Sequence, residues 1–342
     1  MTVPGIDWPR LVAWMGEHVP SAGAPVSVSL ISGGRSNLTY LVEAAERRVV
    51  LRRPPLGHVL PTAHDMRREW RVISALYGTP VPVPPPLAFC ADDEVIGAPF
   101  YVMGHVDGAA VRDRAELTTG VEETRRLSQR LAEVLAEIHA VDYAAVGLAD
   151  FGRPEGYLAR QLDRWCQQWA RSADREEPAY DRLVARLRDR LPATSASTLV
   201  HGDYRLDNTL VSLAPPEIRA VVDWEMSTLG DPLADLGLTL TYWHDPGDEE
   251  RAAIPVAGDV TLAPGFLNTA EFAAHYAKVS GRDLSDLDFY VAFGNFKLAV
   301  IVEGIHARFR QGKTVGEGFE SIGGAVPVLI ERAHRTLDSR TP

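Results

Sequence analysis

The sequence predicts an α+β protein with two lobes, a small antiparallel β-rich lobe followed by a larger, mainly helical lobe. The chain has 342 residues, whereas a single domain usually holds roughly 100–200. Short segments of alternating polarity dominate its first third, and amphipathic helical patterns dominate the rest. We therefore place an N-terminal lobe at residues 1–104 and a C-terminal lobe at residues 105–342.

Three short strands joined by tight turns are expected over residues 26–53. The segments VSVSLI, LTYLVE and RVVLRR alternate in polarity and are rich in β-branched residues. Gly33-Gly34 and Ala44-Ala45 lie where the turns are needed, and Pro54-Pro55 ends the third strand. The pattern is that of a β-meander.

A helix is expected from a cap at Thr62 to about Tyr77. Its apolar face carries four residues at helical spacing, namely Met66, Trp70, Ile73 and Leu76. Glu69 falls on the same face and therefore points inward, where a carboxylate needs a partner.

After this helix the chain is extended and then becomes helical. The PVPVPPP run of residues 80–86 is typical of an ordered polyproline-like connector. Residues 87–90 and 98–108 resemble a hairpin, and a lobe boundary near residues 103–108 fits its end. Further helical patterns cover residues 121–141, about 155–170, 178–190, 268–279 and 286–311.

The polar residues that indicate chemistry cluster in residues 198–237, between apolar strand-like pieces. His201, Asp203 and Asn208 have the spacing H-x-D-x4-N, and Asp223 ends a later buried strand. Phosphoryl transfer needs a carboxylate to orient and deprotonate a hydroxyl, and hard oxygen ligands for Mg²⁺. Asp203 suits the first task, and Asn208 and Asp223 suit the second. The alternative is that these are only turn and capping residues.

Two acidic neighbours remain ambiguous. Asp207 is read as a loop cap, and Glu225 either supports a metal site or is a solvated charge.

The segments VHGDYRLDN (200–208) and VVDWEMSTLGDPLADLG (221–237) resemble the aminoglycoside phosphotransferase and choline kinase superfamily. LRRPP, REWRVISAL, RQLDRW and FGNFKLAVIVEGIHARF resemble its branch of kinase-like domains joined to some acyl-CoA dehydrogenases. Together these segments span roughly residues 30–310.

The resemblance implies a bilobal protein-kinase-like fold and an ATP- or GTP-dependent small-molecule kinase. It implies Asp203 as the catalytic base and Asn208 and Asp223 as Mg²⁺ ligands. Asp231 and Asp235 fall in the family's G-D-P-x-x-D segment, where they would support the catalytic loop.

The same resemblance implies a nucleotide site in the N-terminal lobe. The SGGRSN turn would cover the phosphates, and the end of the last strand would meet the adenine. The residues concerned are Gly33, Gly34, Arg35, Ser36 and Asn37 in the turn, and Met103, His105 and Val106 at the strand end. Ordinary turn and strand-end roles are the alternative.

One departure concerns the strand lysine that touches phosphates and pairs with a helix glutamate in kinase-like lobes. No lysine precedes position 278, so Arg52 is the expected substitute and Glu69 its partner. Arg53 should face the other side of the strand. Arg52→Ala is then expected to raise the nucleotide KM more than it disturbs folding, whereas a purely structural ion pair is the alternative.

The acceptor site is expected on the helix near residue 160. Arg160 and Arg164 are four residues apart, beside Trp165, and could bind a carboxylate or phosphate. A solvated basic face is the alternative, and the net charge of −11 favours cationic ligands instead. The branch resemblance adds a hint of hydroxy acids or hydroxyacyl-CoA esters as acceptors.

Composition limits the partners. With 35 basic and 46 acidic residues, the chain should repel nucleic acid and anionic membranes. No apolar run is long enough for a membrane span or a secretory signal, so we expect a cytoplasmic protein with a small-molecule substrate. Cys90 and Cys166 are expected to be free thiols. No sequence feature indicates an oligomeric state.

Competing functions remain open at this stage. The missing strand lysine is compatible with a nucleotide-binding pseudokinase that serves as a partner module. An aminoglycoside- or choline-type kinase is a further alternative, and a metal-dependent hydrolase would need more histidine ligands than His201 alone provides.

Overall fold

The computed structural model of the chain divides it into two compact units. Unit 1 comprises Met1–Gly108 and Arg219–Ser227, and unit 2 comprises Ala109–Ile218 and Thr228–Pro342. The structure describes residues 3–31, 37–56, 65–173, 176–192, 197–252, 254–255, 258–312 and 319–339.

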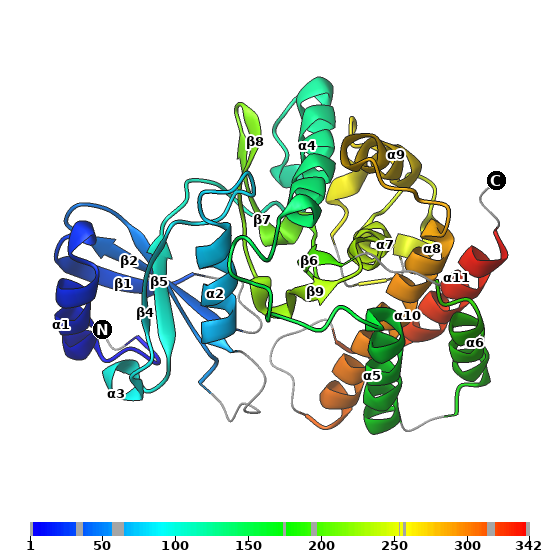
Figure 1. The fold of residues 1–342 in the computed structure, drawn as a ribbon, viewed down its shortest axis with the longest axis horizontal. Helices are drawn as coiled ribbons and strands as arrows, with labels where there is room; N and C mark the ends of the chain where they lie inside the picture. The colour runs from blue at the N-terminus through cyan, green and yellow to red at the C-terminus, as the bar shows by residue number, and fades with distance from the viewer. Residues whose placement is uncertain are drawn as a thin grey trace. The chain divides into compact units, whose positions relative to one another are not determined.

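Unit 1 is built on an antiparallel sheet with the strand order β1-β2-β3-β5-β4 (Figure 1). The strands are β1 (Pro25–Leu30), β2 (Leu38–Ala44), β3 (Val49–Arg53), β4 (Pro86–Cys90) and β5 (Phe100–Gly104). The predicted meander and hairpin are both present. The central strands β3 and β5 are buried along almost their whole length, whereas the edge strand β1 is largely exposed.

The two faces of this sheet are covered by different helices (Figure 1). Helix α1 (Trp8–His18) buries Leu11 and Met15 against Leu51 and Phe100. Helix α2 (Met66–Leu76) packs on the other face, against β4 and β5. Short α3 (Asp93–Ile96) joins β4 to β5. Neighbouring residues of β3 therefore face different helices.

Two boundaries in unit 1 differ from the sequence prediction. Helix α2 begins at Met66, because the Asp65 carboxylate caps it by accepting the N–H groups of Arg67 and Arg68; the predicted cap Thr62 lies outside the described residues. Unit 1 runs to Gly108 rather than to residue 104 and also includes Arg219–Ser227. The Val221 N–H donates to the Pro82 carbonyl at 2.8 Å, which ties this late segment to the proline-rich connector.

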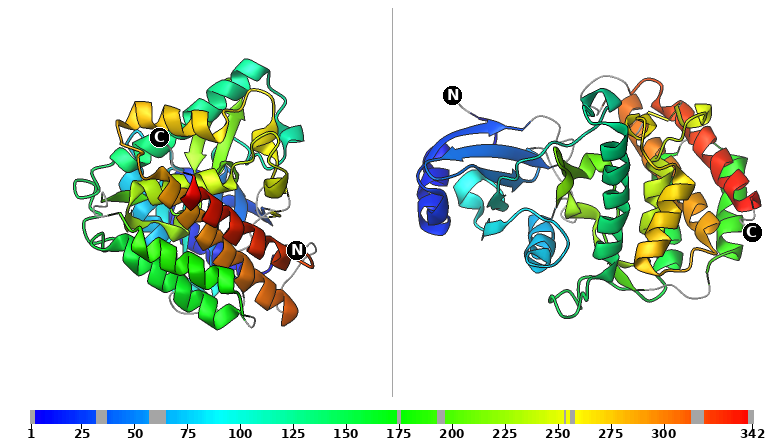
Figure 2. Two further views of the ribbon diagram at one scale, coloured as in Figure 1. Left: turned by 90° about the vertical axis from the view of Figure 1, so that its right-hand side faces the viewer. Right: turned by 90° about the horizontal axis from the view of Figure 1, so that it is seen from above.

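Unit 2 is mainly helical. Helix α10 is its central element and packs against α5, α7 and α11 (Figure 2). The helices are α4 (Val121–Ala140), α5 (Tyr157–Ser172), α6 (Pro178–Asp189), α7 (Pro232–Tyr242), α8 (Glu249–Ala252), α9 (Thr269–Ser280), α10 (Leu287–Arg310) and α11 (Ala325–Asp338). Its strands are β6 (Thr198–Val200), β7 (Thr209–Leu213) and β9 (Thr228–Gly230). Strand β8 (Pro216–Val221) begins in unit 2 and ends in the segment assigned to unit 1.

In the described residues, five helices were not among the predicted ones, namely α1, α3, α7, α8 and α11. Helix α7 packs against α10, and most of its side chains are buried. A helix that is buried on most sides carries apolar residues all round, so its sequence shows little amphipathic periodicity. Its N-terminus is capped by Asp231, whose carboxylate accepts the Leu233 N–H at 2.9 Å.

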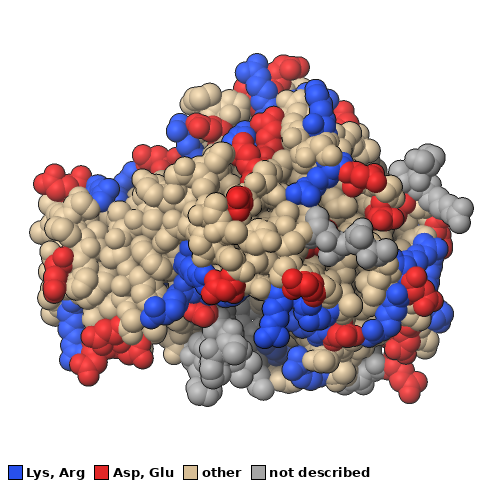
Figure 3. Space-filling view, viewed as in Figure 1, with Lys and Arg blue, Asp and Glu red and all other residues tan. Residues whose placement is uncertain are grey.

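Charged side chains of both signs are interspersed on the face shown in Figure 3, without a large area of one sign. Within the described part of the chain, no helix combines the length and apolar character needed to cross a bilayer. Cys90 and Cys166 are free thiols, as predicted.

We expect Gly237→Ala to destabilise unit 2, because α7 approaches α10 closely at this glycine. A Cβ at Gly237 would lie 2.3 Å from the Tyr290 carbonyl oxygen, which belongs to the backbone and cannot rotate away. Overpacking of this kind costs about 1–3 kcal/mol. Thermal melting should show a lower Tm than wild type.

Gly304→Ala in α10 is the matched control. Its Cβ would meet only Ser172 and Gln168 side-chain atoms at 3.6 and 3.7 Å, so the helix propensity of alanine should leave the Tm unchanged or raise it. Equal Tm values for both variants would contradict the close approach.

Candidate functional site

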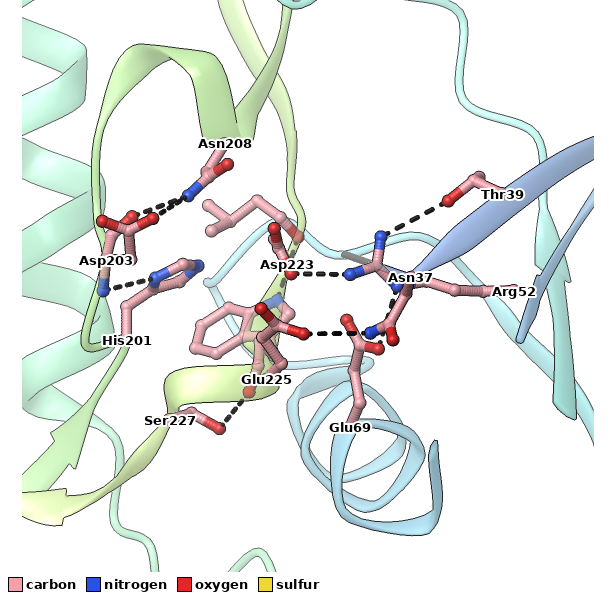
Figure 4. Close-up of polar contacts among 12 residues, drawn as sticks. Asn37, Thr39, Arg52, Glu69, His201, Asp203, Asn208, Asp223, Glu225 and Ser227 are labelled. Carbon is pink, nitrogen blue, oxygen red and sulfur yellow. Dashed lines mark hydrogen bonds and ion pairs between the residues drawn. The ribbon is translucent and has the colours of Figure 1, made fainter. Parts of the chain in front are cut away.

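Arg52 is the central polar residue of unit 1. It lies on β3, next to Arg53, which faces the other side of the strand and donates to the carbonyls of Gly5 and Ile96. The Arg52 guanidinium donates from Nε to Glu69 Oε2 at 2.9 Å and from Nη2 to Asp223 Oδ1 at 2.6 Å (Figure 4). Its third contact, with Thr39 Oγ1, is longer at 3.4 Å.

This arrangement holds charges away from water. The Glu69 side chain is fully buried, and burial raises its pKa although Arg52 acts in the opposite direction. Burial opposes the charge of Arg52 as well, but the neighbouring carboxylates of Glu69 and Asp223 outweigh it and raise the pKa of the guanidinium. Burial likewise raises the pKa of Tyr101, which lies beside this pair. Arg52 therefore stays charged and compensates two carboxylates.

Asp223 has a backbone conformation that is uncommon for a residue with a side chain. Its φ and ψ are 65° and 57°, in the left-handed region, and it is the one non-glycine residue of positive φ found in the described chain. Such conformations concentrate at functional sites. Two residues later, Glu225 Oε2 accepts a hydrogen bond from Asn37 Nδ2 at 3.1 Å, so Glu225 is held by a partner within unit 1.

In unit 2, the loop after β6 is shaped by a buried carboxylate. Asp235 on α7 accepts the N–H of His201 at 2.7 Å and the N–H of Gly202 at 2.9 Å. His201 in turn accepts the Asp203 N–H on its Nδ1 at 3.2 Å, so this histidine braces the backbone (Figure 4). Gly202 has a φ of 84°, which a glycine adopts without strain.

The carboxylate of Asp203, the predicted catalytic base, accepts a hydrogen bond from Asn208, a predicted Mg²⁺ ligand. Asn208 Nδ2 donates to the Asp203 carbonyl oxygen at 2.8 Å and to Asp203 Oδ2 at 3.0 Å (Figure 4). Arg205 contacts Asp203 at 3.9 Å and Asp207 at 3.0 Å, so Asp207 has an ion-pair partner in the loop. The Asp203 carboxylate is 30% exposed, which leaves it accessible to a substrate.

The donor chemistry fits Mg²⁺, which prefers hard oxygen ligands and keeps several ligands from water and phosphate. Because its amide nitrogen is engaged by Asp203, Asn208 has its side-chain oxygen available for a cation. In unit 1, the Asp223 carboxylate has Oδ1 paired with Arg52 and is 29% exposed. No group of three His, Cys, Asp or Glu side chains suited to a metal occurs in the described residues.

Asp235 belongs to a fully buried hydrogen-bond network. His139 Nε2 lies 3.3 Å from Asp235 Oδ2, and His139 Nδ1 lies 2.7 Å from the Tyr276 hydroxyl. Burial would raise the pKa of Asp235, but the hydrogen bonds from His139 and from the His201 backbone hold it below its usual range. Burial lowers the pKa of His139. The ionised carboxylate is therefore favoured in the folded protein.

The predicted adenine-contacting residues lie at and after the end of β5. Met103 pairs with Val50 of β3 and is 7% exposed. The His105 N–H donates to the Arg48 carbonyl at 3.4 Å, and burial lowers the pKa of the His105 side chain. Val106 is partly exposed. Gly33, Gly34, Arg35 and Ser36 of the predicted phosphate turn lie outside the described residues.

The three predicted acceptor-binding residues have different surroundings. Arg160 is exposed and turns back to donate to the carbonyls of Arg153 and Glu155. Arg164 is also exposed, whereas Trp165 is 4% exposed. Trp165 lines a small pocket together with Lys297, and neither arginine lines it.

Lys297 and Tyr242 were not predicted as site residues. The Lys297 ammonium donates to the Gly202 carbonyl at 2.8 Å. Tyr242 lies near Asp203, and burial together with that carboxylate raises the pKa of its hydroxyl. Lysine is rare in this chain, since none precedes position 278, and this rarity is the sequence signal that could have identified Lys297 as a candidate site residue.

Comparison with known proteins supports the predicted resemblance. Residues 27–272 match the profile of a family described as "Phosphotransferase enzyme family". A Rattus norvegicus protein named acyl-CoA dehydrogenase family member 11 is 33% identical, over 98% of this chain and 44% of its own length. The chain spans less than half the length of the curated acyl-CoA dehydrogenase relatives that it matches first.

Solved structures agree with this assignment. A protein from Ralstonia eutropha, assigned as an aminoglycoside phosphotransferase, has a TM-score of 0.83 and 34% identity, covering 97% of this chain and 98% of its own. The GDP complex of an aminoglycoside 2′-phosphotransferase has a TM-score of 0.62 at 16% identity, covering 96% and 99% of the two chains, and shows likeness of fold alone. The predicted kinase-like fold and the predicted branch are confirmed.

We expect Arg52→Ala to destabilise unit 1, contrary to the balance expected from the sequence, because it leaves the buried Glu69 without its cation. Breaking a buried ion pair costs about 3–5 kcal/mol. Burial already raises the pKa of Glu69, and loss of Arg52 raises it further. The added instability should therefore shrink as the pH is lowered from 8 to 5, because protonation of Glu69 removes the stranded charge, and should grow as the pH rises.

Thermal melting across this pH range is the measurement. The control is the double variant Arg52→Ala/Glu69→Gln, which removes the uncompensated charge and should regain much of the lost Tm. A pH-independent loss of Tm in Arg52→Ala would contradict the role of Glu69 as the stranded charge.

Asp235→Asn and Asp231→Asn should have unequal effects. Asparagine offers one acceptor oxygen, so at position 235 it leaves a buried backbone N–H without a partner, at a cost of roughly 1–3 kcal/mol. At position 231 burial raises the pKa of the carboxyl group, and an amide can still accept the Leu233 N–H and donate to the Tyr290 hydroxyl. Denaturant unfolding should show a clear loss of unfolding free energy for Asp235→Asn and less than half of that loss for Asp231→Asn. A larger loss for Asp231→Asn than for Asp235→Asn would refute this account.

Proposed function

We propose that this chain, which belongs to the phosphotransferase enzyme family, is an Mg²⁺-dependent kinase that transfers the γ-phosphoryl group of ATP or GTP to a hydroxyl group of a small molecule. The observation that carries the proposal is the Asp203 carboxylate held by Asn208 in a loop braced by Asp235. This is a carboxylate whose position is fixed by neighbours but which remains open to a substrate.

Asp203 has the role of catalytic base. Its carboxylate orients the acceptor hydroxyl and takes its proton as the oxygen attacks the γ-phosphorus. A new P–O bond forms, the bond from the γ-phosphorus to the β,γ-bridging oxygen breaks, and the nucleoside diphosphate leaves with that oxygen. Asn208 donates to Asp203 Oδ2, and the Tyr242 hydroxyl also forms a hydrogen bond with the Asp203 side chain, so both neighbours orient the carboxylate.

Asn208 and Asp223 are the residues that would hold Mg²⁺, through the amide oxygen of the first and the carboxylate of the second. When bound, the ion neutralises charge on the transferred phosphoryl group. Arg52 lies in contact with Asp223 and would bind nucleotide phosphate through its remaining N–H groups, in place of the usual lysine. Because a guanidinium is a planar fork, it can serve a phosphate and a carboxylate together.

The acceptor is proposed to be a hydroxy acid or its CoA ester. The relatives named as acyl-CoA dehydrogenase family members motivate this class, since a kinase joined to such an enzyme would act on a related acyl compound. Aminoglycosides and choline-like alcohols form the comparison set, because the GDP-bound neighbour is named for an aminoglycoside substrate.

Nucleotide binding is tested first. At a hundredfold excess over Kd, Mg²⁺-ATP or Mg²⁺-GTP should stabilise the protein by about 2.7 kcal/mol, and chelation of the metal with EDTA should remove most of this shift in Tm. Release of ADP or GDP is then measured against the acceptor panel. A shift without turnover on any acceptor would favour the pseudokinase alternative, and no shift would refute the nucleotide site.

Asp203→Asn should lower kcat by about 10²–10⁴-fold, because an amide cannot take the proton, while the nucleotide Kd stays within about twofold. The control is Asp163→Asn, whose carboxylate pairs with Arg188 on the surface of unit 2 and which should retain wild-type kcat. Rates of nucleoside diphosphate release provide both values. An unchanged kcat in Asp203→Asn would exclude this residue as the base.

A further inference from the structure

Lys297 presents a cation directly beside the catalytic loop. It lies on α10, and its ammonium donates to the carbonyl of Gly202, the residue before Asp203, at 2.8 Å. The same ammonium lies over the ring of Trp165, 5.5 Å from its centroid. A cation over an indole face is stabilised by about 0.5–2 kcal/mol, so α10 and α5 together fix its position.

The surroundings of Lys297 form a pocket within unit 2. The pocket holds about 20 Å³, room for one group the size of a water molecule. It combines an apolar ring, a side-chain amide and a cation, supplied by Trp165, Gln161 and Lys297, beside the Gly202 backbone. A ligand could therefore place one small group, such as a single oxygen atom, in this pocket.

Among the residues that line this pocket, Lys297 is the cation and Asp235 is the carboxylate. Among the described residues, no carboxylate oxygen lies within 4.0 Å of the Lys297 ammonium, the distance limit for an ion pair. Asp235 lines the pocket, but its oxygens already accept the N–H groups of His201 and Gly202. Burial lowers the pKa of Lys297, the charges of Asp203 and Asp235 raise it, and the positive charge of Arg164 lowers it.

An ammonium can donate three hydrogen bonds, and the protein uses one of them, on Gly202. The remaining N–H groups are therefore available to an oxygen atom that enters the pocket. A cationic group entering there would meet Lys297 at close range and be repelled.

We propose that Lys297 is an acceptor-binding residue, whose ammonium binds an anionic oxygen of the acceptor substrate in the pocket beside Trp165 and Gln161. The inference rests on the proposed function. Because Lys297 is fixed to the residue before Asp203, an acceptor bound there has its hydroxyl oriented relative to the base. The pocket therefore selects hydroxylated acids over amino alcohols.

The test compares wild type with Lys297→Met and Lys297→Arg on matched acceptors, namely short hydroxycarboxylates, diols of the same length and the corresponding amino alcohols. Lys297→Met should raise the KM for the hydroxycarboxylates at least tenfold, leave the KM for nucleotide within about twofold, and reduce the preference for hydroxycarboxylate over diol. Lys297→Arg should restore part of that preference. Lys278→Met, at an exposed lysine of α9, is the control and should behave as wild type.

A purely structural role would look different. If Lys297 only held the loop through Gly202, Lys297→Met would lower kcat equally for hydroxycarboxylates and diols and leave their relative KM values unchanged, which would overturn the proposal. An unaltered KM in all variants would overturn it as well.

A direct binding measurement distinguishes failure of the proposed kinase function from failure of the Lys297 subsite. Thermal shift with the hydroxycarboxylates in the absence of nucleotide should stabilise wild type and Lys278→Met but not Lys297→Met. If wild type shows no phosphoryl transfer but this pattern holds, the subsite stands and the kinase activity falls. If transfer is found and the three proteins shift equally, the kinase activity stands and the subsite is refuted.

Discussion

The conformation of the loop that carries Asp203 depends on one buried carboxylate, Asp235. Asp235 accepts two successive backbone N–H groups, from His201 and Gly202, and is itself kept ionised by His139. Backbone groups at this depth need partners, so the path of the loop follows from the position of α7. That position depends in turn on the close approach of Gly237 to α10. Helix packing thus determines where Asp203 lies.

Unit 1 also contains one buried charge that satisfies two partners, but there the buried charge is positive. There a buried cation, Arg52, satisfies two carboxylates that come from distant parts of the chain, Glu69 and Asp223. A lysine in its place would be a compact charge without the fork that engages both partners. The replacement of lysine by arginine therefore has a structural consequence as well as a proposed role toward phosphate.

The two cationic positions serve different proposed partners. Arg52 is proposed to bind the nucleotide and Lys297 the acceptor, and each is held by protein groups that leave some of its N–H donors unused. An overall net charge of −11 gives no hint of either, because recognition is determined by the local balance of charge. The exposed Arg160, by contrast, is already bound to carbonyls of its own chain.

The sequence by itself determined the α+β class, the meander, most of the helices, and the pairing of Arg52 with Glu69, because these follow from periodicity and from the cost of an unpaired inward charge. It also identified the loop of Asp203 and Asn208 by spacing. Only the tertiary structure showed that Asp223 shares Arg52, that Asp235 shapes the loop, and that Lys297 reaches Gly202. These contacts join residues 34 to 171 positions apart, and no local pattern encodes them. Their geometry arises only when the helices and strands pack.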